Sequence, residues 1–394
     1  MGMLKDFLRL EAAGGILLFA TALLGLAAAN SAFSGWYAAL LDTTVAVQVG
    51  ALTISKPFIL WINDGLMAVF FFLIGLEVKR EVLEGELSSP DQIVLPGLGA
   101  IGGIAVPAFI YSSMNWGNSV AMSGWAVASA TDIAFALGIL SLFGKRVPPA
   151  LKVFLLTLAI FDDLAAIVII AVFYAGDLSL TMLGIAAGIL ACGIAANLLG
   201  VRRPSVYLLI GVALWISVLQ SGVHATLAGV LIALCIPLRE EGGISPLKSV
   251  EGDLHTPVAY FILPLFAFAN AGLALSGMGL QDLASPVALG IVAGLVLGNP
   301  VGILLFTGIG VALGFARLPA GVNWLQLAGV SFICGVGFTM SLFIAGLAFE
   351  HAGGAYYDVV RLGILAGSTL AAIAGCLVLL LGIKFDPAKK SRIG

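Results

Sequence analysis

Residues 149–175 read PALKVFLLTLAIFDDLAAIVIIAVFYA, an apolar run with the acidic pair Asp162 and Asp163 near its centre. At about 1.5 Å per helical residue, this run is long enough to cross the roughly 30 Å hydrocarbon core of a bilayer. Each ionisable group at that depth costs about 2.5–3.5 kcal/mol on insertion scales, so such groups are functional candidates by default. The stretch therefore predicts a membrane-spanning helix with a buried acidic site.

The composition of the whole chain also indicates a membrane protein. Of its 394 residues, 61% are hydrophobic and only 10% are charged, against about 25% charged residues in soluble domains. The mean hydropathy is +1.13, and the 50 glycines suit close helix packing better than a β-barrel. The predicted fold class is an all-α polytopic membrane protein, with residues 1–394 forming a single domain.

The same composition removes support from several other classes. A net charge of -3 gives no indication of a nucleic-acid partner. The cysteines lie far apart in apolar runs without CxxC spacing, so neither disulfides nor a metal cluster is expected, and no cofactor is predicted. These cysteines are Cys192, Cys235, Cys334 and Cys376.

Twelve apolar runs are predicted to be membrane spans. They cover approximately residues 12–32, 58–78, 94–114, 121–143, 149–175, 180–200, 204–219, 222–238, 256–275, 286–313, 324–349 and 359–383. Residues 94–175 and 286–383 each contain three of these runs.

The basic residues give the predicted orientation of these spans. Except for Lys56 and Arg361, they fall in alternate loops and in the two tails, as Lys79 and Arg80 do after the second run. Basic residues accumulate in cytoplasmic loops, so both termini are expected in the cytoplasm. The first run could alternatively be a secretory signal cleaved after Ala29, but its length and the many runs that follow favour a span.

Residues 44–55, between the first two runs, alternate apolar with polar or small side chains around Gly50. This pattern predicts a β-hairpin within residues 43–57 on the outer side of the membrane. Because an isolated hairpin is marginal in water, it is expected to pair with the hairpin of a second copy or to pack on the helix ends.

The acidic residues within the runs are the candidates for chemistry. Asp132 lies in the fourth run and Asp162 and Asp163 in the fifth, whereas Asp64 lies near the outer end of the second. No Lys or Arg lies at the depth of the pair, which disfavours a purely structural ion pair. Adjacent helical side chains point about 100° apart, so one carboxyl is expected to bind an ion and the other to meet a neighbouring helix. Protons and a small hard cation would then compete for the same oxygens.

Two of the runs contain small and polar residues at mid depth, ASATD at 128–132 and CGVGFTMS at 334–341. Such segments favour interrupted helices whose freed backbone groups line a cavity. A pair of interrupted segments in two halves of a chain is typical of inverted-repeat transporter sites.

Further motifs resemble the NhaA family of sodium/proton antiporters along nearly the whole chain. They are GLEVKRE at 75–81, ATDIAFALG at 130–138, SGVHATLAG at 221–229, LPLFAFANAG at 263–272 and GFTMS at 337–341, together with the 162–163 pair. The resemblance implies exchange of Na⁺, and also Li⁺, for protons by pH-regulated alternating access across the bacterial inner membrane. It also implies that residues 94–175 and 286–383 form inverted repeats. The homodimer is expected from the hairpin.

The resemblance also implies roles for individual residues. Asp163 would be the main cation and proton ligand, with Asp162 its proton-carrying neighbour. Thr131 and Asp132 would lie where the interrupted helices cross, with Asp132 compensating the charge of the helix ends.

Other roles implied by the resemblance have plainer alternatives. A cytoplasmic group of Glu77, Arg80, Glu81 and Glu251 resembles the pH sensor of the family, although a solvated helix end has the same composition. His224 is expected to be a packed or capping histidine rather than a pH switch. Asp64 is expected to be a helix N-cap or an outer funnel charge.

One residue departs from the family pattern, which has a lysine where this chain reads Asn299, between Gly298 and Pro300. In the family that lysine is thought to pair with the carboxylate equivalent to Asp162. Asparagine carries no charge, so Asp162 is expected to hold its proton to higher pH. Exchange stays electrogenic if Asp162 carries the second proton, and becomes electroneutral if the lysine did; the retention of both aspartates favours the first.

Two rival functions were weighed against ion exchange. An intramembrane aspartyl protease also buries paired carboxylates, but it needs aspartates on facing helices and typically a Gly-x-Gly-Asp motif, which neither Asp132 nor Asp163 has. The only sequence feature that separates a passive cation channel from a transporter here is the lack of a repeated filter motif. The sequence therefore favours a transporter over an enzyme.

Overall fold

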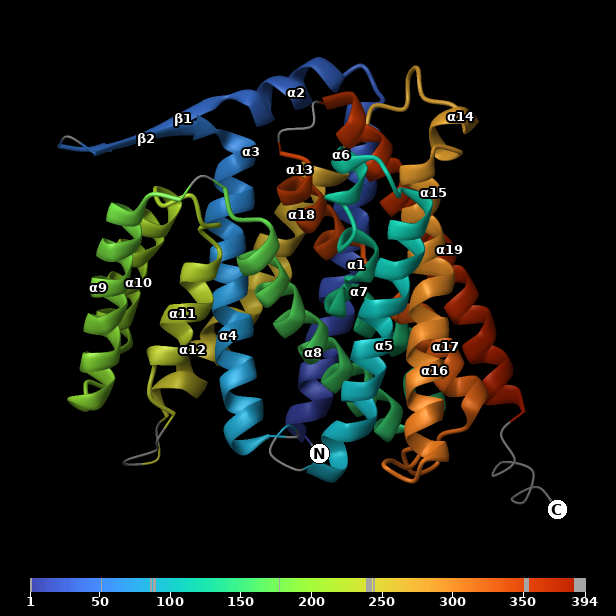
Figure 1. Ribbon diagram of the computed structural model, residues 1–394. Helices are drawn as coiled ribbons and strands as arrows, with labels where there is room; N and C mark the ends of the chain where they lie inside the picture. The colour runs from blue at the N-terminus through green and yellow to red at the C-terminus, as the bar shows by residue number, and fades with distance from the viewer. Residues whose placement is uncertain are drawn as a thin grey trace.

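Apolar helices stand side by side in one bundle, with a two-stranded sheet projecting from one end (Figure 1). The computed structural model describes residues 2–50, 52–85, 87, 90–176, 178–238, 243, 245–350 and 354–385. Four basic residues that contributed to the predicted orientation, Arg239, Lys389, Lys390 and Arg392, lie outside this part of the chain. Helix α1 begins and α19 ends at the lower end of the bundle in Figure 1.

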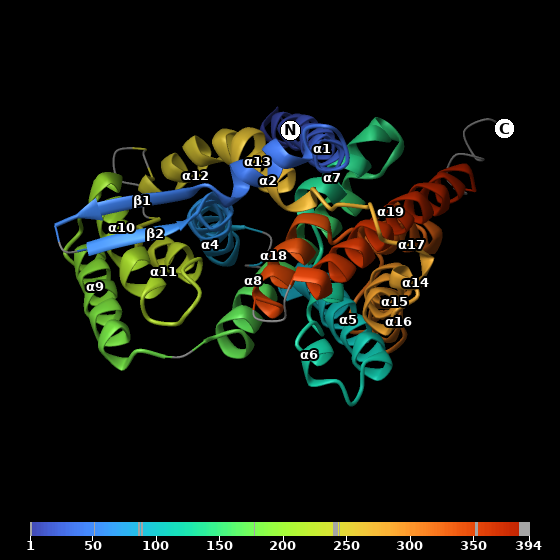
Figure 2. The ribbon, with the colours of Figure 1, turned by 90° about the horizontal axis from the view of Figure 1, so that it is seen from above.

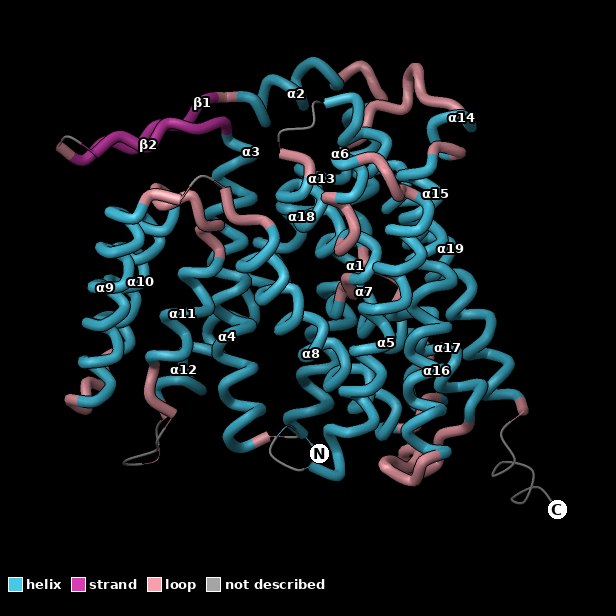
Figure 3. The backbone as a smooth tube through the Cα atoms, viewed as in Figure 1, coloured by secondary structure: helices cyan, strands magenta, loops and turns pink. Residues whose placement is uncertain are grey.

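Each predicted run contains helical structure (Figure 3). In the first half of the chain the elements are α1 (Gly2–Ala29), α2 (Ser34–Asp42), β1 (Thr44–Val49), β2 (Leu52–Pro57), α3 (Phe58–Leu60), η1 (Trp61–Leu66), α4 (Met67–Glu84), α5 (Pro90–Met114), α6 (Ser119–Met122), η3 (Val127–Ser129), α7 (Ile133–Leu142), η4 (Gly144–Arg146), α8 (Pro149–Phe173) and α9 (Leu180–Leu198).

The second half continues with α10 (Pro204–Leu219), α11 (Leu227–Cys235), α12 (Pro246–Pro257), η5 (Val258–Ile262), α13 (Leu263–Ala271), α14 (Leu280–Leu283), α15 (Pro286–Ala293), η6 (Gly294–Gly298), α16 (Asn299–Ala312), α17 (Trp324–Cys334), α18 (Phe338–Ala348) and α19 (Gly354–Lys384). Proline occupies the first turn of α8, α10, α12 and α15. Its fixed φ and missing N–H suit that position, so the sequence itself marks these helix starts.

The twelve predicted runs differ in how much of each is helical. Among the described residues, 8 helices are long and apolar enough to cross a membrane, or up to 10 if each of two bent pairs is one span. Helix α10 is shorter, and α11 covers only Leu227–Cys235 of the predicted 222–238. Residues before α11 form turns because they bond to the loop after α8, as Gly176 N does to Gly222 O at 2.8 Å. The hydropathy of the run comes mainly from α11 itself, LAGVLIALC.

Both predicted helix interruptions are present. The fourth run is divided into α6, η3 and α7, with extended backbone between η3 and Ile133. The eleventh run is divided into α17 and α18, which are bent by 41° relative to each other at the break after Cys334. These two breaks place the unpaired ends of four helical segments inside the bundle.

A backbone-to-backbone contact holds α5 against α16. A Cβ at Gly102 would lie 2.1 Å from the carbonyl oxygen of Gly302, and a Cβ at Gly302 would lie 2.0 Å from that of Gly102. Only glycine allows this approach, which is how small residues serve helix packing in membranes. The contact fixes α16, and with it Asn299, beside the broken fourth run.

The segments predicted as repeats share an order of elements. Residues 94–175 contain α5, the broken α6–η3–α7 and α8, and residues 286–383 contain α15–α16, the broken α17–α18 and α19. Helix α5 ascends in Figure 1, whereas α15–α16 descends. The repeat relationship remains a prediction that this order makes reasonable.

The predicted hairpin is confirmed. Strands β1 and β2 pair antiparallel, from Thr44 opposite Pro57 to Val49 opposite Leu52, with Gly50 at φ +60° in the turn. Trp61 Nε1 donates to Val45 O at 3.0 Å and ties the base of the hairpin to the bundle. From above, the hairpin extends over α9, α10 and α11, on the side opposite α19 (Figure 2).

Candidate functional site

The two interrupted runs cross at Asp132. Its backbone N–H donates to Val336 O at 2.8 Å, which joins the two breaks directly. Its Oδ1 accepts from Phe135 N at 2.9 Å, and its Oδ2 accepts from both the backbone N–H, at 3.0 Å, and the hydroxyl of Thr339. Asp132 therefore caps α7 and α18 with one carboxylate. Both helix ends carry partial positive charge, which a carboxylate compensates.

Hydroxyl groups satisfy further backbone groups at the crossing. Ser341 Oγ donates to Val127 O at 2.7 Å, and Ser368 Oγ accepts from Phe338 N at 3.2 Å. Unpaired backbone groups are costly in a bilayer, so these contacts stabilise irregular backbone at mid depth.

Asp162 and Asp163 lie on α8, next to the crossing, and are 5% and 3% exposed. Asp162 Oδ2 is 2.6 Å from Thr131 Oγ1, so this carboxyl meets a neighbouring segment, as the 100° rule suggested. Asp162 Oδ1 and Asp163 Oδ2 are buried without a hydrogen-bond partner. Within the described residues no ion pair includes either aspartate. A buried carboxylate in this condition needs a proton or a cation.

Asn299 lies at the start of α16 and is fully buried. Its Nδ2 donates to Ala128 O, in the η3 segment, at 3.1 Å, while its Oδ1 has no partner. The amide thus holds the broken run rather than replacing a charge beside Asp162. Asn299 thus contributes packing and a hydrogen bond at this position.

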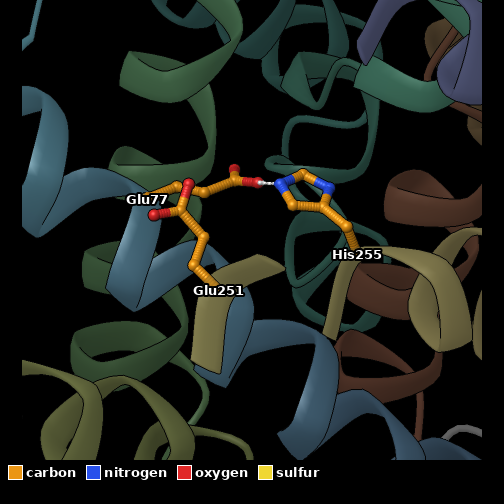
Figure 4. A group of neighbouring side chains, drawn as sticks. All are labelled: Glu77, Glu251 and His255. Atoms are coloured by element: carbon orange, nitrogen blue, oxygen red, sulfur yellow. Dashed lines mark ion pairs between the residues drawn. The ribbon is translucent and has the colours of Figure 1, made fainter. Parts of the chain in front are cut away.

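A second polar cluster lies at the lower end of α4 and on α12. Arg80 Nε donates to both Glu251 oxygens, at 2.9 and 3.0 Å, and its guanidinium lies 2.6 Å from Glu81. Figure 4 shows Glu77 paired with His255, at 3.1 Å, beside Glu251. The four residues of the predicted pH sensor are therefore brought together, and His255 joins them.

Sequence reasoning missed His255. It lies one helical turn after Glu251, and this spacing could have predicted that the two side chains share a face of α12. The potential ligand atoms of Glu77, Glu251 and His255 lie within 4.8 Å of one another, a spacing that could hold a metal ion. The ion pairs with Arg80 and within the Glu77–His255 pair already account for this grouping.

A small cavity adjoins this cluster. Its volume is about 40 Å³, and its lining includes Glu77 and His255 at one side and Ile133, Leu137 and Leu156 of α7 and α8 at the other. That is room for at least one water, which needs roughly 10–15 Å³. The cavity lies between the cluster and the helices that carry the buried aspartates.

Asp64 and His224 lie apart from both clusters. Asp64 is inside η1 and is not an N-cap, because the helix already begins at Phe58; instead it pairs with Lys56 at 2.8 Å. His224 lies in the loop before α11, where its Nε2 donates to Tyr174 O. Burial lowers the pKa of the His224 imidazole below its usual range. The neutral ring at neutral pH favours packing over sensing.

Comparison with known proteins gives the family. The model of the family described as Na+/H+ antiporter 1 matches residues 5–379. The chain is 55% identical over its full length to the Na(+)/H(+) antiporter NhaA of Aeromonas hydrophila, covering 99% of that protein. It is 57% identical to the NhaA of Pseudomonas fluorescens strain Pf0-1, over 94% of both chains, and 56% identical to the NhaA of Shewanella sp. strain W3-18-1, over 94% of this chain and 96% of the relative. The chain has a membrane-spanning bundle with two interrupted helices and a buried aspartate pair, and its sequence matches this family along nearly its whole length. The chain belongs to the Na⁺/H⁺ antiporter 1 family.

Proposed function

We propose that this protein exchanges Na⁺ for H⁺ at Asp162 and Asp163 by alternating access. The observation that carries the proposal is the pair of adjacent buried carboxyls, each with an oxygen that no described residue satisfies. The NhaA relatives are named Na(+)/H(+) antiporters, which agrees with a transporter rather than an enzyme.

Exchange follows from competition at these oxygens. A buried carboxylate without a partner is unfavourable, so it takes up either a proton or a hard cation. A site that holds one at a time and opens to each side in turn couples the two flows. Asp163, with no hydrogen bond to its Oδ2, is the proposed principal ligand; Li⁺ is a second substrate of the same hard-cation class.

The hydroxyl of Thr131 links the protonation state of Asp162 to the backbone at the crossing of the two interrupted runs. Its hydroxyl oxygen is 2.6 Å from Asp162 Oδ2 and 2.9 Å from Cys334 O, at the end of α17. One hydroxyl proton cannot serve both acceptors. When Asp162 is protonated it donates to Thr131, which donates to Cys334 O; when Asp162 is ionised, Thr131 turns to it and releases that carbonyl. The freed carbonyl oxygen is then available to a cation.

Asp132 has a supporting role in this scheme. Each of its oxygens already accepts from backbone N–H groups, so it stabilises the crossing rather than exchanging ions. The same contacts argue against an aspartyl protease, because Asp132 is the aspartate on a facing segment and is not free to act as an acid. Asp162 and Asp163, adjacent on one helix, cannot face each other.

We further propose that Glu77, Arg80, Glu81 and Glu251 sense cytoplasmic pH. Their ion pairs depend on the charge of each carboxylate and of His255, so protonation alters how α4 is held to α12. The cavity beside Glu77 is large enough for a water molecule and also borders α7 and α8, which supports a connection between this cluster and the aspartate site. In this proposal the protein spans the inner membrane, and the lower end of the bundle in Figure 1, where α1 begins and α19 ends, faces the cytoplasm.

The hairpin is the proposed contact between two copies of the chain. Two strands alone have two open edges and are marginally stable. Val45 and Val47 are 37% and 47% exposed on strand β1, which leaves apolar surface to be covered.

The first prediction concerns the ion site. Asp163→Asn should reduce Na⁺-dependent proton movement in proteoliposomes to the level of empty vesicles, because the amide cannot exchange a proton for a cation. Asp132→Ala should retain part of the activity, since water can replace some of the capping bonds. Asp253→Asn, the same change at an exposed position of α12, is the control. Robust exchange by a folded Asp163→Asn protein would contradict the assignment.

The second prediction concerns competition. Apparent Na⁺ affinity should strengthen as pH rises from about 6 to about 9, by up to about tenfold per pH unit for each proton that Na⁺ displaces. Exchange at saturating Na⁺ should also rise if the cytoplasmic cluster is a separate sensor. A flat profile at saturating Na⁺ would remove only the sensor, whereas a Na⁺ affinity independent of pH would refute competition.

The third prediction concerns stoichiometry. Asp162 is retained, and its carboxyl is hydrogen-bonded to Thr131 and not to Asn299. Asp162 should therefore carry the second transported proton, and exchange should be electrogenic. Rates should therefore change when a membrane potential is imposed. Asn299→Lys is the comparison variant, and its added charge should let Asp162 ionise at lower pH. Potential-independent rates in the wild type, with transport limiting the signal, would mean that one proton moves per Na⁺.

The fourth prediction concerns assembly. Deletion of residues 45–54 should shift the protein toward monomer in mild detergent while exchange persists, because the hairpin lies far from the aspartates. Light scattering gives the mass of the protein component. A mass that does not change on deletion would rule out pairing through the hairpin.

A further inference from the structure

A deep apolar groove runs between α1, α7 and α19, away from the aspartate pair. Its volume is about 560 Å³, within the roughly 300–1,000 Å³ typical of ligand pockets. The lining comes from residues 15–26 of α1, 135–142 of α7 and 365–377 of α19, with Ala271, Val336 and Phe338 between them.

Among the described residues, the lining of the groove is almost entirely apolar. Its hydroxyl side chains are those of Ser368 and Thr369. Ser368 already accepts from Phe338 N, and Thr369 donates to Leu365 O at 2.7 Å. Among the described residues that line the groove, Cys376, which is half-buried, is the one with an ionisable side chain. The occupant must therefore be apolar.

The rim of the groove faces hydrocarbon. Leu142 and Leu377 are 70% and 58% exposed, and they belong to the membrane-crossing helices α7 and α19. The hairpin, proposed to join two copies, lies on the opposite side of the bundle (Figure 2). A second copy bound there leaves the groove open to lipid.

The dimensions match one acyl chain. From Gly15 to Leu26 the lining part of α1 extends about 17 Å at about 1.5 Å per residue. Half of a hydrocarbon core of roughly 30 Å, the depth that one leaflet fills, is about 15 Å. A groove of this length and depth left empty would forfeit dispersion contacts along its whole lining.

The floor of the groove is the helix crossing itself. Val336 accepts the backbone hydrogen bond of Asp132, and Phe338 opens α18. Rings connect the wall to this floor, with centroids 5.9 Å apart for Phe19 and Phe135 and 5.6 Å for Phe135 and Phe338. Whatever fills the groove packs against the residues that surround the break in α17–α18.

We propose that one acyl chain of a membrane phospholipid occupies the groove between α1, α7 and α19 and packs against Phe338 at the helix crossing. This lipid site is distinct from the ion site and does not depend on which cation is exchanged. It makes the bilayer a structural component of the crossing.

The test is photolabelling of the full chain in phospholipid vesicles that contain a phospholipid with a diazirine on its acyl chain, followed by peptide mapping. Phe135 and Leu365 line the groove and are half-buried, so a chain inside the groove contacts them, whereas lipid that only surrounds the protein contacts mainly the exposed residues. Labelling of these positions is the expected result.

A groove-filling variant provides the second measurement. Ala372→Phe, and Cys376→Phe if the first does not fold, should reduce labelling of Phe135 and Leu365 several-fold and leave labelling of α9 unchanged. Ala187→Phe, at an exposed position of α9, should leave groove labelling as in the wild type. Label confined to exposed surfaces, groove label unaffected by filling, or cross-links that join two copies at the groove would each overturn the proposal.

Discussion

Every backbone N–H and C=O within a bilayer must find a partner inside the protein, and the rest of this structure depends on how that constraint is met at two broken helices. The direct bond from Asp132 N to Val336 O pairs one break with the other. The carboxylate of Asp132 then serves the first turns of α7 and α18. Because irregular backbone is tolerated only where it is so satisfied, the crossing exists at the depth at which these contacts can be made.

The same constraint separates the three buried aspartates by role. Asp132 has its oxygens filled by donors from two helices, so its charge is compensated in place. Asp162 has one oxygen engaged by Thr131 and one without a partner, and Asp163 has an oxygen with none. Residue type and depth are alike for all three, and hydrogen-bond partners are what distinguish a structural carboxylate from one poised to exchange ligands.

Much of this organisation could be predicted from the sequence, for physical reasons that differ between elements. Long apolar runs predicted most spans because hydrocarbon thickness fixes their length, and alternation around Gly50 predicted the hairpin. In the run at 222–238, helix α11 covers only Leu227–Cys235, because the residues before it form turns that bond to the segment after α8, and hydropathy does not report such contacts. Asp64 is not a cap because the helix already begins at Phe58, before it in the chain. The partners of Thr131, Asn299 and His255 are set by contacts across the bundle, and hydropathy carries no information about them.

The contact of Gly102 with Gly302 has a mechanical consequence. Where side chains mediate a helix contact, changes of rotamer can absorb a displacement; two backbones that touch have no such freedom. Helices α5 and α16 must therefore translate and tilt as one piece. Asn299, on α16, is bonded to the η3 segment through Ala128, and α8 packs against α5, where Leu158 meets Gly99. Any movement of the α5–α16 pair is therefore passed on both to the broken backbone and to the helix that carries the two carboxyls of the proposed ion site.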